Sequence, residues 1–179
     1  FFRRLEKITK RKFKFEKDNP GVVDTDGDGI DDEVYSTNVV TLKNLVKFLV
    51  QYTKGKTIKV CAFASVSDKY DIPFWISYRK AKNIMREYLN ELCVEGIVKS
   101  LIVNVSTVDT GNENMLRPKA DKTYWLQPQE VVIEALDKLT SLRSYEEIDV
   151  IKPKPEFDEK YYLDHDSILE KWKKEMGDK

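Results

Sequence analysis

Hydrophobic residues alternate with other residues between positions 58 and 65, and from 76 to 92 they recur at helical spacing. The alternation has the period of two that is typical of a β-strand. The second stretch predicts an amphipathic helix with one wide buried face, formed by Ala81, Ile84, Met85, Tyr88, Leu89 and Leu92. The loop between them, 65–77, is expected at the carboxyl end of the strand, where α/β sheets commonly bind ligands.

The same two periods predict further elements along the chain. Strands are expected at 12–16, 101–105 and 147–150, and helices at 42–52, 128–139 and 166–176. The strand at 101–105 is almost continuously apolar, as a strand covered on both faces would be. The order β-α-β-α-β-α-β predicts an α/β (α+β) sandwich with a mixed sheet and helices packed on one face. The last helix is expected either to dock on this domain or to contact a partner.

A dense acidic motif, Asp24-Thr25-Asp26-Gly27-Asp28-Gly29-Ile30-Asp31-Asp32, follows the first predicted strand. When the positions of this motif are counted from Asp24, it has carboxylates at positions 1, 3, 5 and 9, a glycine at position 6 and a backbone carbonyl at position 7. This is the pattern of a calcium-binding loop. The predicted Ca²⁺ ligands are Asp24, Asp26, Asp28, the Ile30 carbonyl and Asp32. Tyr35 stands at position 12 in place of an acidic ligand, so either binding is weaker or Glu33 contributes. The other interpretation is an acidic, solvated turn without metal.

Composition sets bounds on the function classes. The 179 residues carry 31 basic and 31 acidic side chains, so the formal net charge is zero and nothing favours nucleic-acid binding. No apolar run approaches the ~20 residues that span a bilayer. The basic segment 1–11 is interpreted as an amphipathic lead-in helix, or as the flank of an upstream membrane helix, and the true amino terminus is expected to be missing. Cys61 and Cys93 are expected to be buried thiols rather than a disulfide.

The run Ile76-Ser77-Tyr78-Arg79-Lys80-Ala81, followed by Ile84 and Tyr88-Leu89, resembles the L-S-x-x-R-A-x-x-V-x-x-Y-L signature of OmpA-like, peptidoglycan-associated domains. Ala62-Phe63-Ala64-Ser65 stands where that family has G-H-T-D and is similar to the G-Y-A-S of Bacteroides-type envelope proteins. The acidic loop resembles those of thrombospondin type 3-like and bacterial EF-hand-like repeats. The resemblance implies an OmpA-like domain over 12–152, with the calcium loop inserted at 22–36 and a Pro linker and helix at 153–179.

In that family an aspartate and an arginine hold the charged ends of diaminopimelate in the peptidoglycan stem. Ser65 and Lys80 occupy these positions here, with Ser77 beside them, so the resemblance implies a degenerate ligand pocket. Ser65 offers no charge to an ammonium group, and Lys80 makes no bidentate clamp on a carboxylate. Residues 144–147 are acidic where the family has a basic pair. Weak or no peptidoglycan binding is therefore expected.

Catalytic chemistry has little support in the sequence, and the chain is predicted not to be an enzyme. His165 lies in a charged run and is interpreted as part of a solvated helix start rather than as a metal ligand. The other candidates for catalysis are Ser65 as a nucleophile and Lys80 as its base. The expected function is a calcium-stabilised structural scaffold domain of a bacterial cell-envelope assembly, periplasmic and associated with the outer membrane. The alternative is a peptidoglycan-binding anchor.

Two segments outside the predicted core are the expected contact surfaces for other envelope proteins. Segment 106–127 is long and irregular, and such loops in compact domains are usually functional or disordered. Tyr124 and Trp125 near its end are interpreted as a lid packed on the domain, with a ligand platform as the alternative. The second segment is 161–176. The chain is expected to contact a membrane only through the missing N-terminal segment, as a stator-like subunit tethered by a membrane helix would.

Overall fold

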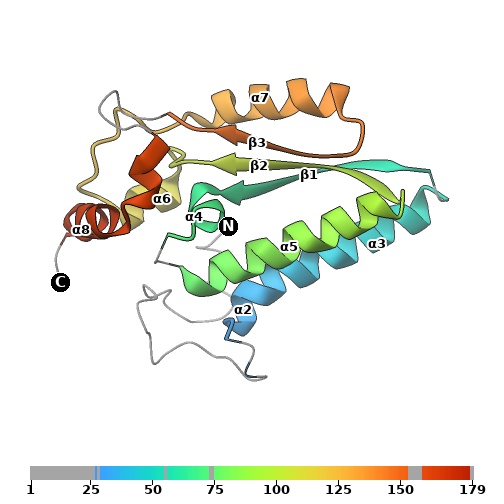
Figure 1. Ribbon diagram of the computed structural model, residues 1–179, viewed down its shortest axis with the longest axis horizontal. Helices are drawn as coiled ribbons and strands as arrows, with labels where there is room; N and C mark the ends of the chain where they lie inside the picture. Colours follow the sequence, from blue (N-terminus) through green and yellow to red (C-terminus); the bar gives the residue numbers. More distant parts are fainter. Residues whose placement is uncertain (1–26, 28, 55, 73–74, 153–158, 178–179) are drawn as a thin grey trace.

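The computed structural model describes residues 27, 29–54, 56–72, 75–152 and 159–177 (Figure 1). The helical elements are α2 (Asp32–Tyr35), the π-helix η1 (Ser36–Val40), α3 (Thr41–Tyr52), α4 (Val66–Lys69), α5 (Ile76–Val94), α6 (Gly111–Leu116), α7 (Pro128–Ser141), the 3-10 helix η2 (Glu159–Leu163) and α8 (His165–Met176). The strands are β1 (Ile58–Ser65), β2 (Val98–Val105) and β3 (Tyr145–Val150). The strand predicted at 12–16 lies outside the described residues.

The three strands form a parallel sheet in the order β1-β2-β3, and the register places Ala64, Asn104 and Asp149 side by side. Helices cover both faces of this sheet: α3 and α5 lie on one face and α7 lies on the other (Figure 1). The α/β class is therefore confirmed. The predicted mixed sheet with helices on one face is wrong for the described residues, because a parallel sheet needs crossover helices and these can return over either face.

Two apolar cores sandwich the sheet. On one face Val46 of α3 and Leu89 of α5 pack against Ala62 and Ile102. On the other face Leu101 and other β2 residues pack against α7. Adjacent residues of β2 thus point into different cores, and both Leu101 and Ile102 are fully buried. The prediction that this strand is covered on both faces is confirmed.

The helix predicted at 76–92 is confirmed as α5, which extends to Val94. Its buried residues Ser77, Ala81, Met85 and Leu89 recur every four residues, as the apolar spacing requires. Trp75 precedes the helix in the left-handed region, with φ of 61°, so the chain turns sharply into α5.

The other three predicted helices, α3, α7 and α8, begin within a few residues of their predicted starts. α7 has Pro128 at its first turn and a capping box formed by Gln127 and Glu130. The cap of α8 is Asp164, whose carboxylate accepts from the Ser167 amide, and not the predicted Asp166. Both cysteines are free thiols. Within the part of the chain that the structure describes, no helix combines the length and apolarity needed to cross a bilayer.

Candidate functional site

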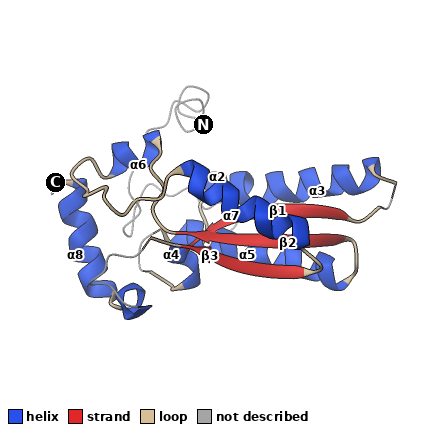
Figure 2. Ribbon diagram, turned by 90° about the horizontal axis from the view of Figure 1, so that it is seen from above, coloured by secondary structure: helices blue, strands red, loops and turns tan. Residues whose placement is uncertain are grey.

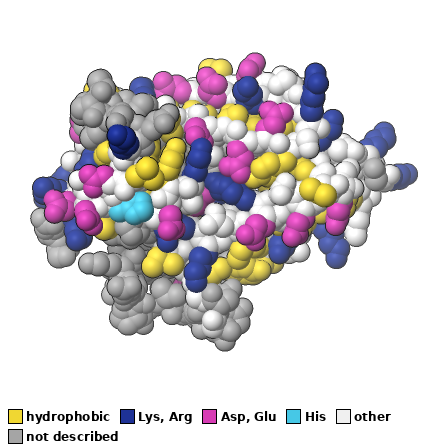
Figure 3. All heavy atoms as spheres, in the orientation of Figure 1, with side chains coloured by type: hydrophobic (Ala, Val, Ile, Leu, Met, Phe, Trp, Pro, Cys, Tyr) yellow, Lys and Arg dark blue, Asp and Glu magenta, His cyan; other side chains and the backbone are white. Residues whose placement is uncertain are grey.

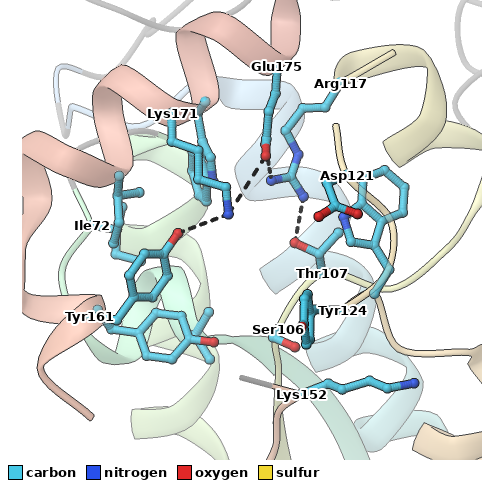
Figure 4. A pocket seen from close by; sticks show the side chains of 15 residues that line it. Ile72, Ser106, Thr107, Arg117, Asp121, Tyr124, Lys152, Tyr161, Lys171 and Glu175 are labelled. Carbon is cyan, nitrogen blue, oxygen red and sulfur yellow. Dashed lines mark hydrogen bonds and ion pairs between the residues drawn. The ribbon is translucent and has the colours of Figure 1, made fainter. Parts of the chain in front are cut away.

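A cavity of about 70 Å³ lies beyond the carboxyl ends of β2 and β3 (Figure 4). Ser106 and Thr107 follow β2 directly, and Lys152 follows β3. The rest of the lining comes mainly from the later part of segment 106–127, between Arg117 and Trp125, and from α8. Because parallel strands all end at one edge of a sheet, this edge brings together residues that are distant in sequence, and open α/β sheets bind ligands there.

Segment 106–127 folds back onto the end of β2. The Leu126 amide donates to the Thr107 carbonyl and the Asp109 amide donates to the Leu126 carbonyl, each at 2.8 Å. Trp125 and Leu126 are buried as a result. The interpretation of this segment as a lid packed on the domain agrees with these contacts, and the same lid lines the cavity.

Arg117 is the central charged group of the cavity wall and is buried. Its guanidinium lies 2.6 Å from a carboxylate oxygen of Glu113 and 3.1 Å from one of Glu175, and it donates to Thr107 Oγ1 at 2.5 Å. The planar group also lies between two indole rings, with its Cζ 5.3 Å from the centroid of Trp125 and 5.2 Å from that of Trp172. Charge, hydrogen bonds and stacking therefore fix Arg117 in one place.

The terminal helix α8 docks on this site. Ile168 is 1% exposed, and the Glu175 carbonyl accepts from the Lys119 amide at 3.0 Å. Lys171 donates to the Tyr161 hydroxyl at 3.3 Å, and burial raises the pKa of Tyr161 to about 12. Of the two interpretations of this helix, docking on the same domain is confirmed. The two predicted contact surfaces, 106–127 and 161–176, are thus one structural unit.

His165 lies at the start of α8, as the sequence suggested. Its Nε2 is 3.0 Å from the carbonyl oxygen of Tyr70, whose ring stacks on that of Tyr162. Among the described residues no group of three or more metal-binding side chains comes together, near His165 or elsewhere.

Ser106 supplies a polar group without a partner inside the fold. Its Oγ is buried and makes no hydrogen bond with the described residues, although Ser106 lines the cavity. Buried hydroxyls are normally hydrogen-bonded, and leaving one unsatisfied costs about 1–3 kcal/mol. A ligand in the cavity could satisfy this group.

A second polar cluster lies on the α5 face of the sheet, away from the cavity. Arg86 of α5 pairs with buried Asp68 at 2.6 Å and donates to Asn104, whose amide donates to Asp149 at 2.9 Å. Burial raises the pKa of Asp68 more than Arg86 lowers it. Asp68 also accepts from the Ser65 amide at the end of β1 at 2.7 Å, so the cluster ties α4, α5 and all three strands together.

Lys82 lies beside this cluster. It donates to the Phe63 carbonyl at 2.8 Å and lies over the ring of Tyr78. Burial lowers the pKa of Lys82 to about 8, despite the opposing effect of Asp68.

The residues of the predicted ligand pocket do not bind one another. Ser65 caps α4, with its Oγ accepting from the Ser67 amide at 3.1 Å. Ser77 is buried, and its Oγ accepts from the Asp31 amide at 3.1 Å. Lys80 is exposed and donates to the Gly29 carbonyl at 3.1 Å. Ser77 and Lys80 therefore anchor the end of the acidic motif to α5, which the sequence did not predict.

Only part of the predicted calcium loop can be placed. Asp24, Asp26 and Asp28 lie outside the described residues. Ile30 is 3% exposed and packs in a small core with Val39 and Ala81, and Asp32 begins α2. Gly29 has φ of +77°, which agrees with the tight turn predicted at position 6 of the loop. The calcium site remains a prediction.

Sequence reasoning missed Arg117, Ser106 and Thr107. An arginine in an irregular segment has no periodic signal, and its acidic and aromatic partners come from distant positions. The available signal was topological: residues that directly follow a buried parallel strand lie at the ligand-binding edge of the sheet.

Comparison with known proteins gives little similarity. No family model matches the chain, and no curated protein sequence matches it. Among solved structures it is similar to one from work on 7beta-hydroxysteroid dehydrogenase stereoselectivity, with a TM-score of 0.48 and 21% sequence identity. The match covers 74% of this chain and 48% of that chain, so the similarity spans about half of the dehydrogenase.

These findings correct two predictions. The resemblance to OmpA-like domains is contradicted, because no family model matches the chain and its described strands form a parallel sheet with helices on both faces. The prediction that the chain is not an enzyme is contradicted by the structural neighbour, which carries the name of an enzyme. Because the TM-score is below 0.5, neither the fold nor the activity of the dehydrogenase is assigned to this chain.

Proposed function

We propose that this chain is a binding module, and that the cavity between segment 106–127 and α8 holds its ligand. The observation that carries the proposal is the buried, unpartnered Ser106 Oγ at the carboxyl edge of the sheet. Ligand sites typically combine aromatic walls with a few fixed polar groups. Tyr124, Trp125 and Trp172 supply the aromatic part, and Thr107 and Arg117 are held by the contacts described above.

The charges around the cavity favour a neutral ligand. Arg117 is matched by Glu113 and Glu175, and Lys152 is paired with Glu130 at 3.3 Å. With these cations already paired, a charged ligand gains little attraction. A neutral sugar suits the site, because its hydroxyls can both donate to and accept from a serine and its flat apolar side can stack on an aromatic ring.

Tryptophan fluorescence tests this proposal, since Trp125 and Trp172 line the cavity and Trp75 does not. Titration with glucose, galactose and mannose is expected to give a saturable change with at least one of them, with Kd of about 1 mM or weaker for a single sugar unit. The Trp75→Phe variant is expected to keep the change, and Trp172→Phe to lose most of it. A signal that never saturates, or that disappears only with Trp75, would contradict the proposal.

The proposed setting is the one that the sequence suggested, a scaffold subunit of a bacterial cell-envelope assembly, in the periplasm next to the outer membrane and stabilised by calcium. Support comes from the tethering of the acidic motif, since Ile30 is buried and Asp31 binds Ser77. Weak or no peptidoglycan binding belongs to the same proposal, because Ser77 and Lys80 are engaged by this motif. Co-purification from envelope extracts, with and without a calcium chelator, tests it: recovery of no envelope protein in either condition would contradict it.

A further inference from the structure

A stripe of exposed apolar side chains runs along α3. Leu45, Phe48 and Tyr52 are 52%, 60% and 75% exposed, and their spacing of three and four residues puts them on one side of the helix. The rings of Phe48 and Tyr52 stack, with centroids 6.0 Å apart. Val46 on another side of α3 is buried in the core with α5 and the sheet. The helix therefore has a second apolar side, here called the outer stripe, that the fold does not use.

The segment of chain that contains the outer stripe carries charge of one sign. No acidic residue occurs between Glu33 and Asp68, and five lysines do. Two of the five are engaged within the fold: Lys43 lies over the Tyr88 ring, and Lys59 donates to the last carbonyls of α7. The other three are exposed and form no ion pair with the described residues; they are Lys47, Lys54 and Lys56.

This basic character is local. Over the face shown in Figure 3, acidic and basic side chains are interspersed, in keeping with the zero net charge of the whole chain. α3 lies along the outer side of the molecule, on the β1 side of the sheet (Figure 2). A single helix presents a convex surface, so its partner has to be flat or deformable.

From these three observations we propose that the outer stripe docks on an anionic phospholipid surface. Leu45, Phe48 and Tyr52 enter the boundary between headgroups and acyl chains, where aromatic side chains are favoured. Lys54 and Lys56, which follow the end of α3 beside Tyr52, contact the lipid phosphates, whose charge complements theirs. The chain thereby lies on a membrane through a side of its own fold, which goes beyond the proposed ligand cavity and is independent of it.

Sedimentation of the full chain with vesicles tests this docking. Vesicles of equal parts phosphatidylglycerol and phosphatidylcholine are expected to carry the protein down, and vesicles of phosphatidylcholine alone are not. Replacing Lys54 and Lys56 by glutamine is expected to weaken binding about 25-fold, since each lysine near an anionic surface contributes roughly fivefold. Phe48→Ser with Tyr52→Ser is expected to weaken binding at least about tenfold.

The matched control is Ile133→Ser with Leu136→Ser, which removes two exposed apolar side chains from α7 on the other face of the sheet. This control is expected to bind vesicles as the unmodified chain does, and circular dichroism of every variant checks that the fold is kept. The proposal is overturned if the chain binds neutral vesicles equally well, if the α7 control loses as much binding as the α3 variants, or if vesicles fail to bind while an acidic amphipathic peptide does.

Discussion

The guanidinium of Arg117 and the carboxylate of Glu175 lie 3.1 Å apart and are both buried, although 58 residues separate them in the chain. Removing Glu175 takes away one of the two carboxylates that compensate the buried guanidinium, and Glu113 remains. Glu175→Ala is therefore expected to lower the free energy of unfolding by about 2 kcal/mol, as measured by urea denaturation. The double change Arg117→Met and Glu175→Met is expected to cost less than the sum of the single changes.

The control for this pair is Lys152→Met, which removes an ion pair with Glu130 whose side chains are 42% and 46% exposed. Exposed pairs contribute about 0–1 kcal/mol, so this variant is expected to unfold at nearly the same urea concentration as the unmodified chain. If the loss of free energy of unfolding is equal for the buried and the exposed pair, burial does not set the strength of the Arg117 contact.

Ser106→Ala is expected to stabilise the protein and to weaken ligand binding. The change removes a buried hydroxyl that has no partner in the free chain, so the free energy of unfolding is expected to rise by about 1 kcal/mol. Sugar binding is expected to weaken about fivefold to tenfold, because one hydrogen bond to the ligand is lost. Ser141→Ala, at an exposed serine of α7, serves as the control for both measurements. Destabilisation by Ser106→Ala would show that the hydroxyl has a partner in the fold.

Lys82 is expected to make stability increase with pH above about 8. Burial lowers the pKa of Lys82 from 10.5 to about 8, so between these values the unfolded chain binds a proton that the folded chain does not. The free energy of unfolding therefore rises with pH in this window. Burial raises the pKa of the Cys61 thiol from 9.0 and that of Tyr78 from 10.0, and both act in the opposite direction at higher pH.

The measurement for Lys82 is a series of urea titrations between pH 7 and 8.5, where most of the Cys61 thiol, with its ordinary pKa of 9.0, and the tyrosines are still protonated in the unfolded chain. Lys82→Met is expected to remove the rise. A rise of the same size in the Lys82→Met variant would mean that another group titrates.

Gly29→Ala is expected to destabilise the protein more than Gly27→Ala. Both glycines have positive φ, +77° and +78°, so alanine at either position is strained by roughly 1–2 kcal/mol. A Cβ at Gly29 would in addition lie 2.4 Å from Lys80 Nζ, whereas a Cβ at Gly27 would meet no atom within 4 Å. The difference in melting temperature between the two variants measures the Lys80 contact, and it should vanish when Lys80→Ala is added to both.

Calcium is expected to raise the melting temperature, and a chelator to lower it. A ligand that binds only the folded chain adds about 2.7 kcal/mol at one hundred times its Kd, which corresponds to a shift of a few degrees for a chain of this size. Asp26→Asn with Asp28→Asn is expected to abolish the shift. Calcium distances to the oxygen ligands of about 2.3–2.6 Å are expected in a crystal structure. An unchanged melting temperature on addition of calcium would favour the metal-free acidic turn.

The elements of this fold could be predicted where one face of a segment is buried. Apolar spacing located α3, α5 and α7 because each buries a regular stripe, and it located β1 and β2 for the same reason. The same patterns do not show which face of the sheet a helix covers, since an apolar stripe packs equally well on either side. The continuous apolar character of β2 did contain that information, because a strand buried on both sides needs helices on both.

The candidate site itself was not predicted from the sequence. The sequence singled out the segments 106–127 and 161–176, but it treated them as separate surfaces because nothing in either one indicates the other. Arg117 becomes informative only when Trp125 and Trp172 close on it from two sides. The residues of the implied ligand pocket, Ser65, Ser77 and Lys80, each bind a neighbouring segment of the chain, and the sequence did not predict these contacts.

The docking of α8 also has a consequence for the order of events during protein synthesis. Arg117 and Trp125 leave the ribosome well before Glu175 does, and at 5–20 residues per second the 58 intervening positions take roughly 3–12 s. During this interval the sheet and its two cores can form, while one wall of the cavity is still being translated. A newly made chain therefore passes through a stage in which Arg117 is open to water, and the site closes only after α8 has emerged.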